Sequence, residues 1–396
     1  MNGKEGPNTM QRYIMDKFFA GMRSVPFQVH YWDGTSTAYG GDAPRFVLTF
    51  KEKVSIKDFV KNPVMSFGEG YMDGVIEIEG KIEDVIQLAT GNREQLWSRA
   101  MPLLSKLTSK SKQKDDVQHH YDISNEFYSL WLDETMSYSC AYFRTPEDTL
   151  EQAQLQKIDH VLKKLQLKPG ETLLDIGSGW GWLIIRAARQ YGVQAKGITL
   201  SEEQYKKTLE RIAEQGLQDQ VKVELIDYRD LAARGEQFDK IASVGMFEHV
   251  GQAHYPTFMH ALETLLKDKG LMLLHTITHA KEEPTDPWIQ KYIFPGGYIP
   301  SLREIVSLLP DYDFNTLDIE NLRLHYAMTL EHWATRYENS LEEVRKMFDE
   351  RFIRMWDLYL QSCAAFFRSG NLNIHQVLFS KGFNNDLSLT RQHLYD

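Results

Sequence analysis

A glycine-rich segment at residues 175–181, with the sequence DIGSGWG, most constrains how this chain folds. It follows an apolar run at 171–174 and leads into 182–188, which has the composition of a helix. Glycine permits the left-handed backbone and close approach that a tight strand-to-helix turn requires. The first amides of such a helix bind anions, so the segment predicts a ligand site. An ordinary tight turn is the alternative.

The spacing of the glycines separates two classes of cofactor. Gly177, Gly179 and Gly181 depart from the G-x-G-x-x-G pattern of dinucleotide-binding folds. With Asp175 ahead of the first glycine, the loop is typical of S-adenosylmethionine sites. The carboxylate of that ligand suits the amide-lined helix end, and Asp175 is expected to order the turn or nearby donors.

Helix and strand patterns alternate from about residue 117 onward. Helices are expected at 150–165, 180–191, 201–215 and 254–266, and strands at 171–176, 193–198, 221–226, 238–244 and 270–275. This alternation predicts an α/β fold with βαβ units and a mostly parallel sheet. Ligands of such sheets bind beyond the carboxyl ends of the strands.

The last part of the chain, from about residue 330, is predicted to be helical. It carries an aromatic stripe at spacings of three and four, made of Phe348, Phe352, Trp356, Tyr359, Cys363, Phe366 and Phe367. Such a stripe usually faces a core. The alternative is that part of it lines a deep apolar tunnel.

Residues 1–105 follow a different pattern, which predicts a small α+β unit. Strands and then a helix are expected at 27–32, 45–50, 75–80 and 82–88. A basic linker is expected at 106–116, and its lysines are Lys106, Lys110, Lys112 and Lys114. The linker is either simply solvated or touches an anionic membrane surface, which attracts lysine.

Composition narrows the class of protein. The net charge of −10 makes nucleic acid a poor partner. Two cysteines, Cys140 and Cys363, do not form a disulfide scaffold and fit a reducing cytoplasm. No apolar run approaches the roughly 20 residues that span a bilayer, and the polar start lacks a signal sequence. We therefore expect a cytoplasmic protein.

Polar residues follow several of the expected strands. Thr199 with Gln204 follows the second strand, and Asp227 with Tyr228 follows the third. Each pair has a local alternative, a helix cap with Ser201 or a plain turn. Beyond Val244, Glu248 and His249 follow the next strand, and His275 ends another. These strand ends meet at one edge of the sheet. A role of Glu248 and the histidines in acid/base catalysis or anion binding is therefore favoured over a purely structural role.

Two other groups point to no chemistry of their own. His119, His120 and Asp122 are incomplete as a zinc site, so no metal is predicted. Cys140 has no cationic neighbour in sequence that would lower its pKa, which argues against a nucleophile.

Together these motifs resemble those of bacterial cyclopropane-fatty-acyl-phospholipid synthases, relatives of the mycolic acid cyclopropane synthases. The resemblance covers essentially all of 117–396, and the segments that carry it are 120–125, 138–143, 175–181, 199–204, 247–249, 275–277, 294–297 and 326–330. Ser178 departs from it, since the family often has Cys there. Residues 1–105 look more weakly like the accessory lipid-binding domain of the bacterial members.

The resemblance implies a Rossmann-like class I methyltransferase sheet with helical additions at 117–396. It implies methylene transfer from S-adenosylmethionine to a cis double bond of an unsaturated phospholipid acyl chain. The implied enzyme is cytoplasmic and peripherally associated with the membrane surface. Members of the family often form homodimers, which nothing in this sequence tests.

The resemblance also implies residue roles. A bound bicarbonate ion would serve as base, held by Glu248, His275 and Tyr326 and by the backbone amides of Cys140 and Ile277. The implied cofactor residues are Tyr138, Ser139, Asp175, Gly177, Ser178, Gly179, Gly181, Thr199, Gln204, Asp227, Tyr228 and Val244.

Two other functions fit parts of the sequence. A small-molecule N-methyltransferase shares several motifs, but an amine substrate needs no base for ring closure. A non-catalytic lipid carrier that kept the fold would be expected to have lost Glu248 or damaged the loop at 175–181. Neither loss is seen.

Overall fold

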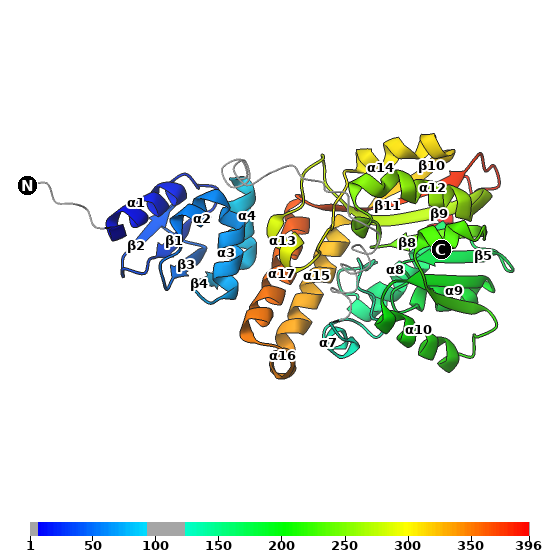
Figure 1. Ribbon diagram of the computed structural model, residues 1–396, viewed down its shortest axis with the longest axis horizontal. Helices are drawn as coiled ribbons and strands as arrows, with labels where there is room; N and C mark the ends of the chain where they lie inside the picture. Colours follow the sequence, from blue (N-terminus) through cyan, green and yellow to red (C-terminus); the bar gives the residue numbers. More distant parts are fainter. Residues whose placement is uncertain (1–6, 93–122, 396) are drawn as a thin grey trace, which may run out of the picture.

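The computed structural model describes residues 7–92 and 123–395. Figure 1 shows an N-terminal unit at one end of the molecule, a large sheet with its helices at the other, and α15, α16 and α17 between them. The expected linker and the domain boundaries at 105 and 117 lie outside the described residues. Within the described part, no helix is long and apolar enough to cross a membrane.

The large sheet has seven strands in the order β10-β11-β9-β8-β5-β6-β7. Its strands are β5 (Thr172–Ile176), β6 (Gln194–Thr199), β7 (Val221–Leu225), β8 (Phe238–Val244), β9 (Leu266–Thr278), β10 (Phe314–Asn321) and β11 (Asn373–Lys381). β11 runs antiparallel to both neighbours, and the other pairings that contain β5 to β9 are parallel. The prediction of a mostly parallel sheet is confirmed. Successive strands are added toward one edge of the sheet from β5 to β7 and toward the other edge from β8 to β9. The order therefore switches between β5 and β8, and folds of this kind bind ligands at such a switch point.

Helices cover this sheet and extend it. They are α7 (Asn125–Ser129), α8 (Leu150–Lys164), α9 (Trp182–Tyr191), α10 (Glu202–Glu214), α11 (Tyr228–Ala233), α12 (Tyr255–Leu265), α13 (Pro287–Tyr292), α14 (Leu302–Leu308), α15 (Arg323–Asn339), α16 (Leu341–Met347) and α17 (Glu350–Ser369). The predicted helices and strands of the alternating region agree with these bounds to within a few residues. The exception is β9, which begins at Leu266 and not at 270.

The C-terminal region differs from its predicted all-helical form, because β11 follows α17. The strand was missed because polar residues interrupt its apolar run. His375 and Gln376 are nonetheless buried, because each meets a side chain of β9 across the sheet. His375 Nδ1 lies 2.8 Å from Thr278 Oγ1, and Gln376 Nε2 lies 3.2 Å from His275 Nδ1.

The N-terminal unit contains a second sheet, of four strands in the order β2-β1-β3-β4. Its elements are α1 (Pro7–Ala20), β1 (Phe27–His30), β2 (Ser36–Tyr39), β3 (Phe46–Phe50), α2 (Ile56–Lys61), α3 (Pro63–Met72), β4 (Ile76–Gly80) and α4 (Ile82–Gly91). Strands and helix occur at the expected positions, and α1, β2, α2 and α3 were not predicted. The core is aromatic, with the rings of Phe27 and Phe46 stacked at 5.4 Å.

The N-terminal unit packs against α13 and α17 through α3 and α4, and Glu77 of β4 reaches α17. The Tyr71 hydroxyl donates to Asp357 at 3.0 Å, and Arg354 pairs with Glu77 at 3.0 Å. The Trp288 ring lies so close to Gly68 that an added Cβ there would stand 2.5 Å from it. These contacts fix the unit beside the helices that border the site described next.

Candidate active site

Two cavities adjoin beyond the carboxyl ends of β5, β6, β8 and β9. The loop cavity is bordered by the glycine-rich turn and by residues 135–139. The cage cavity is bordered by Glu248, His275 and Tyr326 and by α17. The residues that line both are Tyr138, Ser139, Gly245 and His249. A ligand in one cavity therefore meets a ligand in the other along this shared border.

The glycine-rich turn joins β5 to α9 in a form that side chains would not allow. Gly177 and Gly181 have φ values of 84° and 85°, which only glycine adopts at low cost. A Cβ on Gly181 would also lie 2.4 Å from Thr208 Cγ2, and one on Gly177 would lie 2.9 Å from Met246. The glycines thus let the backbone of the turn border the cavity directly.

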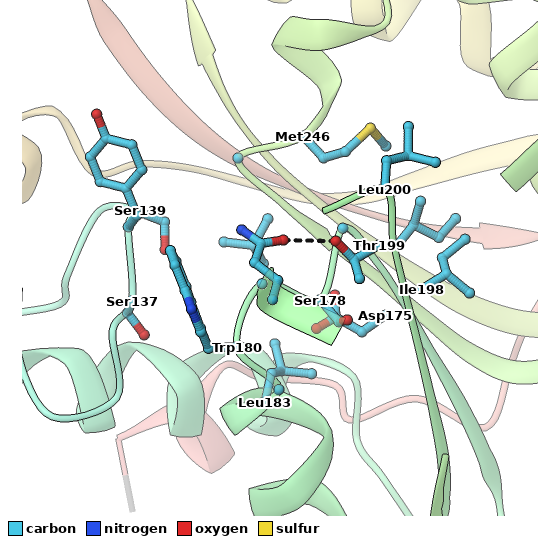
Figure 2. A pocket seen from close by; sticks show the side chains of 18 of the residues that line it. Ser137, Ser139, Asp175, Ser178, Trp180, Leu183, Ile198, Thr199, Leu200 and Met246 are labelled. Carbon is cyan, nitrogen blue, oxygen red and sulfur yellow. Dashed lines mark hydrogen bonds between the residues drawn. The ribbon is translucent and has the colours of Figure 1, made fainter. Parts of the chain in front are cut away.

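Every residue that sequence analysis assigned to the cofactor lines the loop cavity: Tyr138, Ser139, Asp175, Gly177, Ser178, Gly179, Gly181, Thr199, Gln204, Asp227, Tyr228 and Val244. In Figure 2 the side chains of Ser139 and Trp180 stand on one side of this cavity and those of Thr199 and Leu200 on the other. The dashed line there is the 2.7 Å bond that Thr199 donates to Gln204.

The local roles that competed with cofactor binding are also present. Ser201 Oγ accepts from the Gln204 amide at 3.3 Å and caps α10. Asp227 accepts from the Arg229 amide at 2.9 Å and caps α11. The Asp227 carboxylate has further lone pairs, and only the backbone amide of Gln204 is used in the cap, so both side chains can still face the cavity. Capping therefore does not exclude ligand binding.

The polar groups of the loop cavity fit S-adenosylmethionine. Asp175 Oδ1, Ser178 Oγ and Tyr228 OH are shielded from solvent without a hydrogen-bond partner among the described residues. Buried polar atoms are almost always paired, so these call for a polar ligand. A carboxylate suits the ammonium group of an amino acid, and the hydroxyls suit its carboxylate and the ribose.

Lys157 of α8 was missed by sequence reasoning. It is 4% exposed, and its Nζ donates to Ser139 Oγ at 2.8 Å. Its neighbour Gln154 donates to the carbonyls of Ser137 and Ser139 at 3.1 and 2.9 Å. Both residues fall on the buried face of α8, where Lys157 follows Ala153 by four residues and Gln154 by three. That pattern was the available signal.

Lys157 and Asp175 influence each other's charge. Burial raises the pKa of Asp175 to about 7, although the Lys157 charge opposes the rise. Burial lowers the pKa of Lys157 to about 8, opposed by the carboxylates of Asp133 and Asp175. The two groups therefore titrate close to neutral pH at the border of the loop cavity.

The cage cavity contains all the residues that the resemblance implied for the base: Cys140, Glu248, His275, Ile277 and Tyr326. Glu248 follows β8 on a short 3-10 turn, Phe247–His249. Its Oε1 accepts from the Ile277 amide at 2.7 Å, and its Oε2 is shielded without a partner among the described residues. Burial raises the pKa of Glu248. In this structure the Ile277 amide is thus bonded to Glu248.

His275 presents a hydrogen-bond donor to the same cavity. It is 0% exposed, and burial lowers its pKa well below the usual value, so the ring is neutral. Gln376, its partner in the β9–β11 register, donates from Nε2 to His275 Nδ1 at 3.2 Å. The proton of the ring therefore sits on Nε2, which has no partner within the described part of the chain. Gln376 was missed because β11 was missed.

Tyr326 and Cys140 complete the set. Burial raises the pKa of Tyr326 well above its usual value, and nearby Glu248 adds to the rise, so the phenol keeps its proton. Burial also raises the pKa of the Cys140 thiol, even though Lys157 acts in the opposite direction. The thiol is therefore not a nucleophile. Its backbone amide has no hydrogen-bond partner among the described residues.

The aromatic stripe that begins at Phe348 and continues along α17 serves both purposes that the sequence allowed. Phe348, Phe352 and Trp356 surround Phe127 with ring centroids 5.2, 5.5 and 5.1 Å away, which is core packing. The members that line the cage cavity are Tyr359, Cys363, Phe366 and Phe367. The wall of that cavity is therefore largely apolar and aromatic.

No cluster of three or more metal-ligating side chains occurs in the ranges 7–92 and 123–395. His119, His120 and Asp122 lie outside them.

Comparisons with known proteins agree with this geometry. The family model of mycolic acid cyclopropane synthetase matches residues 108–377, and a domain of unknown function matches 14–100. A probable fatty acid methyltransferase of Pseudomonas putida is 39% identical over 382 residues, which cover 94% of this chain and 96% of that protein. The cyclopropane-fatty-acyl-phospholipid synthase of Escherichia coli K12 is 39% identical over 367 residues, covering 89% and 92%.

A solved structure extends the agreement to the fold. The mycolic acid cyclopropane synthase CmaA1, crystallised with SAH and CTAB, superposes with a TM-score of 0.65 at 35% identity. The match covers 69% of this chain and 99% of that one. The expected class I methyltransferase sheet is thereby confirmed. With the family model matching most of its length, the chain belongs to the mycolic acid cyclopropane synthetase family of S-adenosylmethionine-dependent methyltransferases.

Proposed function

We propose that this enzyme transfers a methylene group from S-adenosylmethionine to a cis double bond in an unsaturated phospholipid acyl chain and closes a cyclopropane ring. The observation that carries the proposal is the junction of two unlike cavities along Tyr138, Ser139, Gly245 and His249. One is lined by polar groups that suit the cofactor. The other is largely apolar, apart from hydrogen-bond donors and the carboxylates of Glu248 and Asp286.

When bound, S-adenosylmethionine supplies an electrophilic methyl group. The π electrons of the alkene form the new bond to that carbon while the sulfur keeps the electrons of the broken bond. The other alkene carbon is left as a cation, and loss of a proton from the new methyl group closes the ring. The residues of the chain must therefore align the alkene, exclude water and provide for the proton.

The apolar and aromatic walls of the cage cavity can align the alkene and exclude water. Phe294, Tyr359 and Phe367 present aromatic surface there, and aromatic faces attract cations by about 0.5–2 kcal/mol. Burial raises the pKa of the Tyr326 phenol in this cavity, so it stays neutral. Exclusion of water matters because water would capture the cation before the ring closes.

The polar group of the cage cavity suits a bound bicarbonate ion, which would supply the base for the proton. His275 Nε2, the Tyr326 hydroxyl and the Cys140 amide are donors for its oxygens. Glu248 Oε2 is the acceptor for its hydroxyl, and the Ile277 amide holds Glu248 by its other oxygen at 2.7 Å. The support for this assignment is that His275 Nε2 and Glu248 Oε2 are shielded from solvent and have no hydrogen-bond partner among the described residues.

We further propose that the enzyme works in the cytoplasm at the membrane surface and that the N-terminal unit engages lipid. Removal of residues 1–105 is then expected to reduce activity on phospholipid vesicles more than activity on substrate dispersed in detergent. Equal activity of the full and shortened chains on vesicles would contradict this role.

The central test is incubation with S-adenosylmethionine and vesicles of unsaturated phosphatidylethanolamine, followed by mass spectrometry of the acyl chains. We expect a gain of one CH₂ per modified chain with loss of the double bond. A gain of CH₂ with the double bond retained would contradict ring closure. Methylation of an amine would favour the N-methyltransferase, and binding without conversion would favour the lipid carrier.

A further inference from the structure

A third cavity lies where the N-terminal unit meets α13 and α17; we call it the inter-unit cavity. Its lining residues are Phe18, Phe19, Met22, Leu48, Phe59, Pro63, Val64, Phe67, Gly68, Val85, Ile86, Leu88, Ala89, Asp286, Trp288, Ile289, Leu358, Ser362 and Phe366. Only Asp286 and Ser362 have polar side chains apart from the indole of Trp288. The indole donates to Met72 Sδ at 3.3 Å. The cavity is therefore suited to hydrocarbon.

The helix α17 is the wall between this cavity and the cage cavity. Leu358, Ser362 and Phe366 line the inter-unit cavity, and residues four apart share one face of a helix. The neighbouring face, with Tyr359 and Cys363, lines the cage cavity. Phe366 lines both cavities, as do Ile289 of α13 and Asp286, which caps that helix. The two cavities therefore meet at these side chains.

We propose that the inter-unit cavity receives the methyl-terminal part of the acyl chain whose double bond lies in the cage cavity. The N-terminal unit would then form part of the substrate site itself. This inference rests on the proposed function and deepens it, because it names the place where chain length is read. Phe366 is the side chain that the acyl chain must pass.

The chemistry of the lining selects the hydrocarbon end of the lipid over its head group. A phosphate needs cationic or donor groups, and no Lys or Arg occurs among the described residues that line the inter-unit cavity. The Asp286 carboxylate already accepts from the amides of Trp288 and Ile289, at 2.9 and 3.1 Å. An anionic head group would meet repulsion there, whereas a methyl end meets apolar side chains.

The test compares phospholipids with palmitoleoyl and oleoyl chains. These chains are alike from the carboxyl group to the double bond, and the oleoyl chain has two more methylenes beyond it. Each buried methylene is worth about fourfold in binding, so two are worth about 15-fold. The quantity measured is the ratio of kcat/KM for oleoyl to that for palmitoleoyl lipid.

Two variants of α17 are expected to move this ratio in opposite directions. Ser362→Leu fills the passage beside Phe366 and should lower the ratio by up to about 15-fold. Phe366→Ala widens the passage and should raise the ratio. The control is Ser369→Leu, which makes the same change at an exposed position of α17. Ser369 and Ser362 both donate to the carbonyl three residues earlier, at 3.2 Å.

An unchanged ratio in both variants would overturn the proposal. So would a ratio that changes when the length of the other, saturated acyl chain of the phospholipid is varied and not when the unsaturated chain is varied. If Ser362→Leu does not fold, Phe366→Ala alone decides. The proposed function has a separate readout. If the wild-type chain converts neither lipid, that function fails, whereas conversion of both with no change in ratio refutes only the chain-end site.

Discussion

Replacement of Glu248 by Gln tests the assignment of the base-holding group. The substitution keeps the shape of the side chain, and its carbonyl oxygen can still accept from the Ile277 amide, now 2.7 Å from Oε1. The other oxygen, Oε2, becomes an NH₂ group. It is shielded and has no partner in the described ranges, so the variant presents a donor to the cage cavity where the native chain presents an acceptor.

The size of the effect follows from what that acceptor does. A hydrogen bond to a charged group contributes about 1.5–3 kcal/mol, and correct placement of a general base contributes about 10²–10⁴-fold to rate. We therefore expect kcat to fall by about 10²–10⁴-fold. Folding should not suffer, because burial raises the pKa of Glu248 and thus disfavours its charged form in the folded chain. A neutral amide removes that cost.

The assay follows product by mass spectrometry and binding of S-adenosylhomocysteine by calorimetry. Because Glu248 borders only the cage cavity, affinity for the cofactor product should change by less than about threefold, equivalent to under 1 kcal/mol. Glu263→Gln, on the surface of α12, is the matched control and should retain full activity. Turnover of Glu248→Gln within threefold of wild type refutes the assignment. Equal losses of turnover and of cofactor affinity would indicate that Glu248 contacts the cofactor and not the base.

Three further predictions concern the loop and the strand that supports His275. Burial raises the pKa of Asp175 to about 7, so its carboxylate becomes protonated as the pH falls through that value. Affinity for S-adenosylmethionine, measured by calorimetry, should then decrease between pH 8 and 6. Asp175→Asn should bind weakly and lose the part of this decrease that comes from Asp175, while Lys157, with its pKa lowered to about 8 by burial, still titrates. Gly181→Ala should lower the free energy of unfolding by about 2–4 kcal/mol, from the left-handed backbone and the contact with Thr208. Gly216→Ala, with φ of 65° and nothing within 4 Å of the added Cβ, should lose only about 1–2 kcal/mol in the same denaturation assay. Gln376→Leu removes the bond that fixes the proton of His275 on Nε2 and should lower kcat about tenfold at unchanged cofactor affinity; full activity would show that the tautomer is set elsewhere.

The sequence predicts those parts of the site that local rules determine. The turn at Gly177 and Gly181 is predictable because no other residue adopts its backbone cheaply. Polar residues after buried strands are predictable because parallel strands end at one edge. Lys157 and Gln376 have no local rule of that kind. The spacing of Lys157 from Ala153 indicates the buried face of α8. The contacts of Lys157 with Ser139 and of Gln376 with His275 join residues distant in sequence, so a pattern of apolar residues does not reveal these contacts.

The charges of the two cavities explain why the chemistry is divided between them. Lys157 lines the loop cavity, where its charge is opposed by Asp133 and Asp175. Among the described residues that line the cage cavity there is no Lys or Arg.

Two of the histidines that line the cage cavity, His249 and His275, add no charge either. Burial lowers the pKa of His249 to about 4 and that of His275 well below its usual value, so both are neutral. An anion bound there would be held by neutral donors, and a cation that forms on the substrate would meet no like charge from these two rings. A lysine in place of His275 would bind the anion more strongly and repel that cation at the same time. Neutral donors are therefore the arrangement that serves both demands of ring closure.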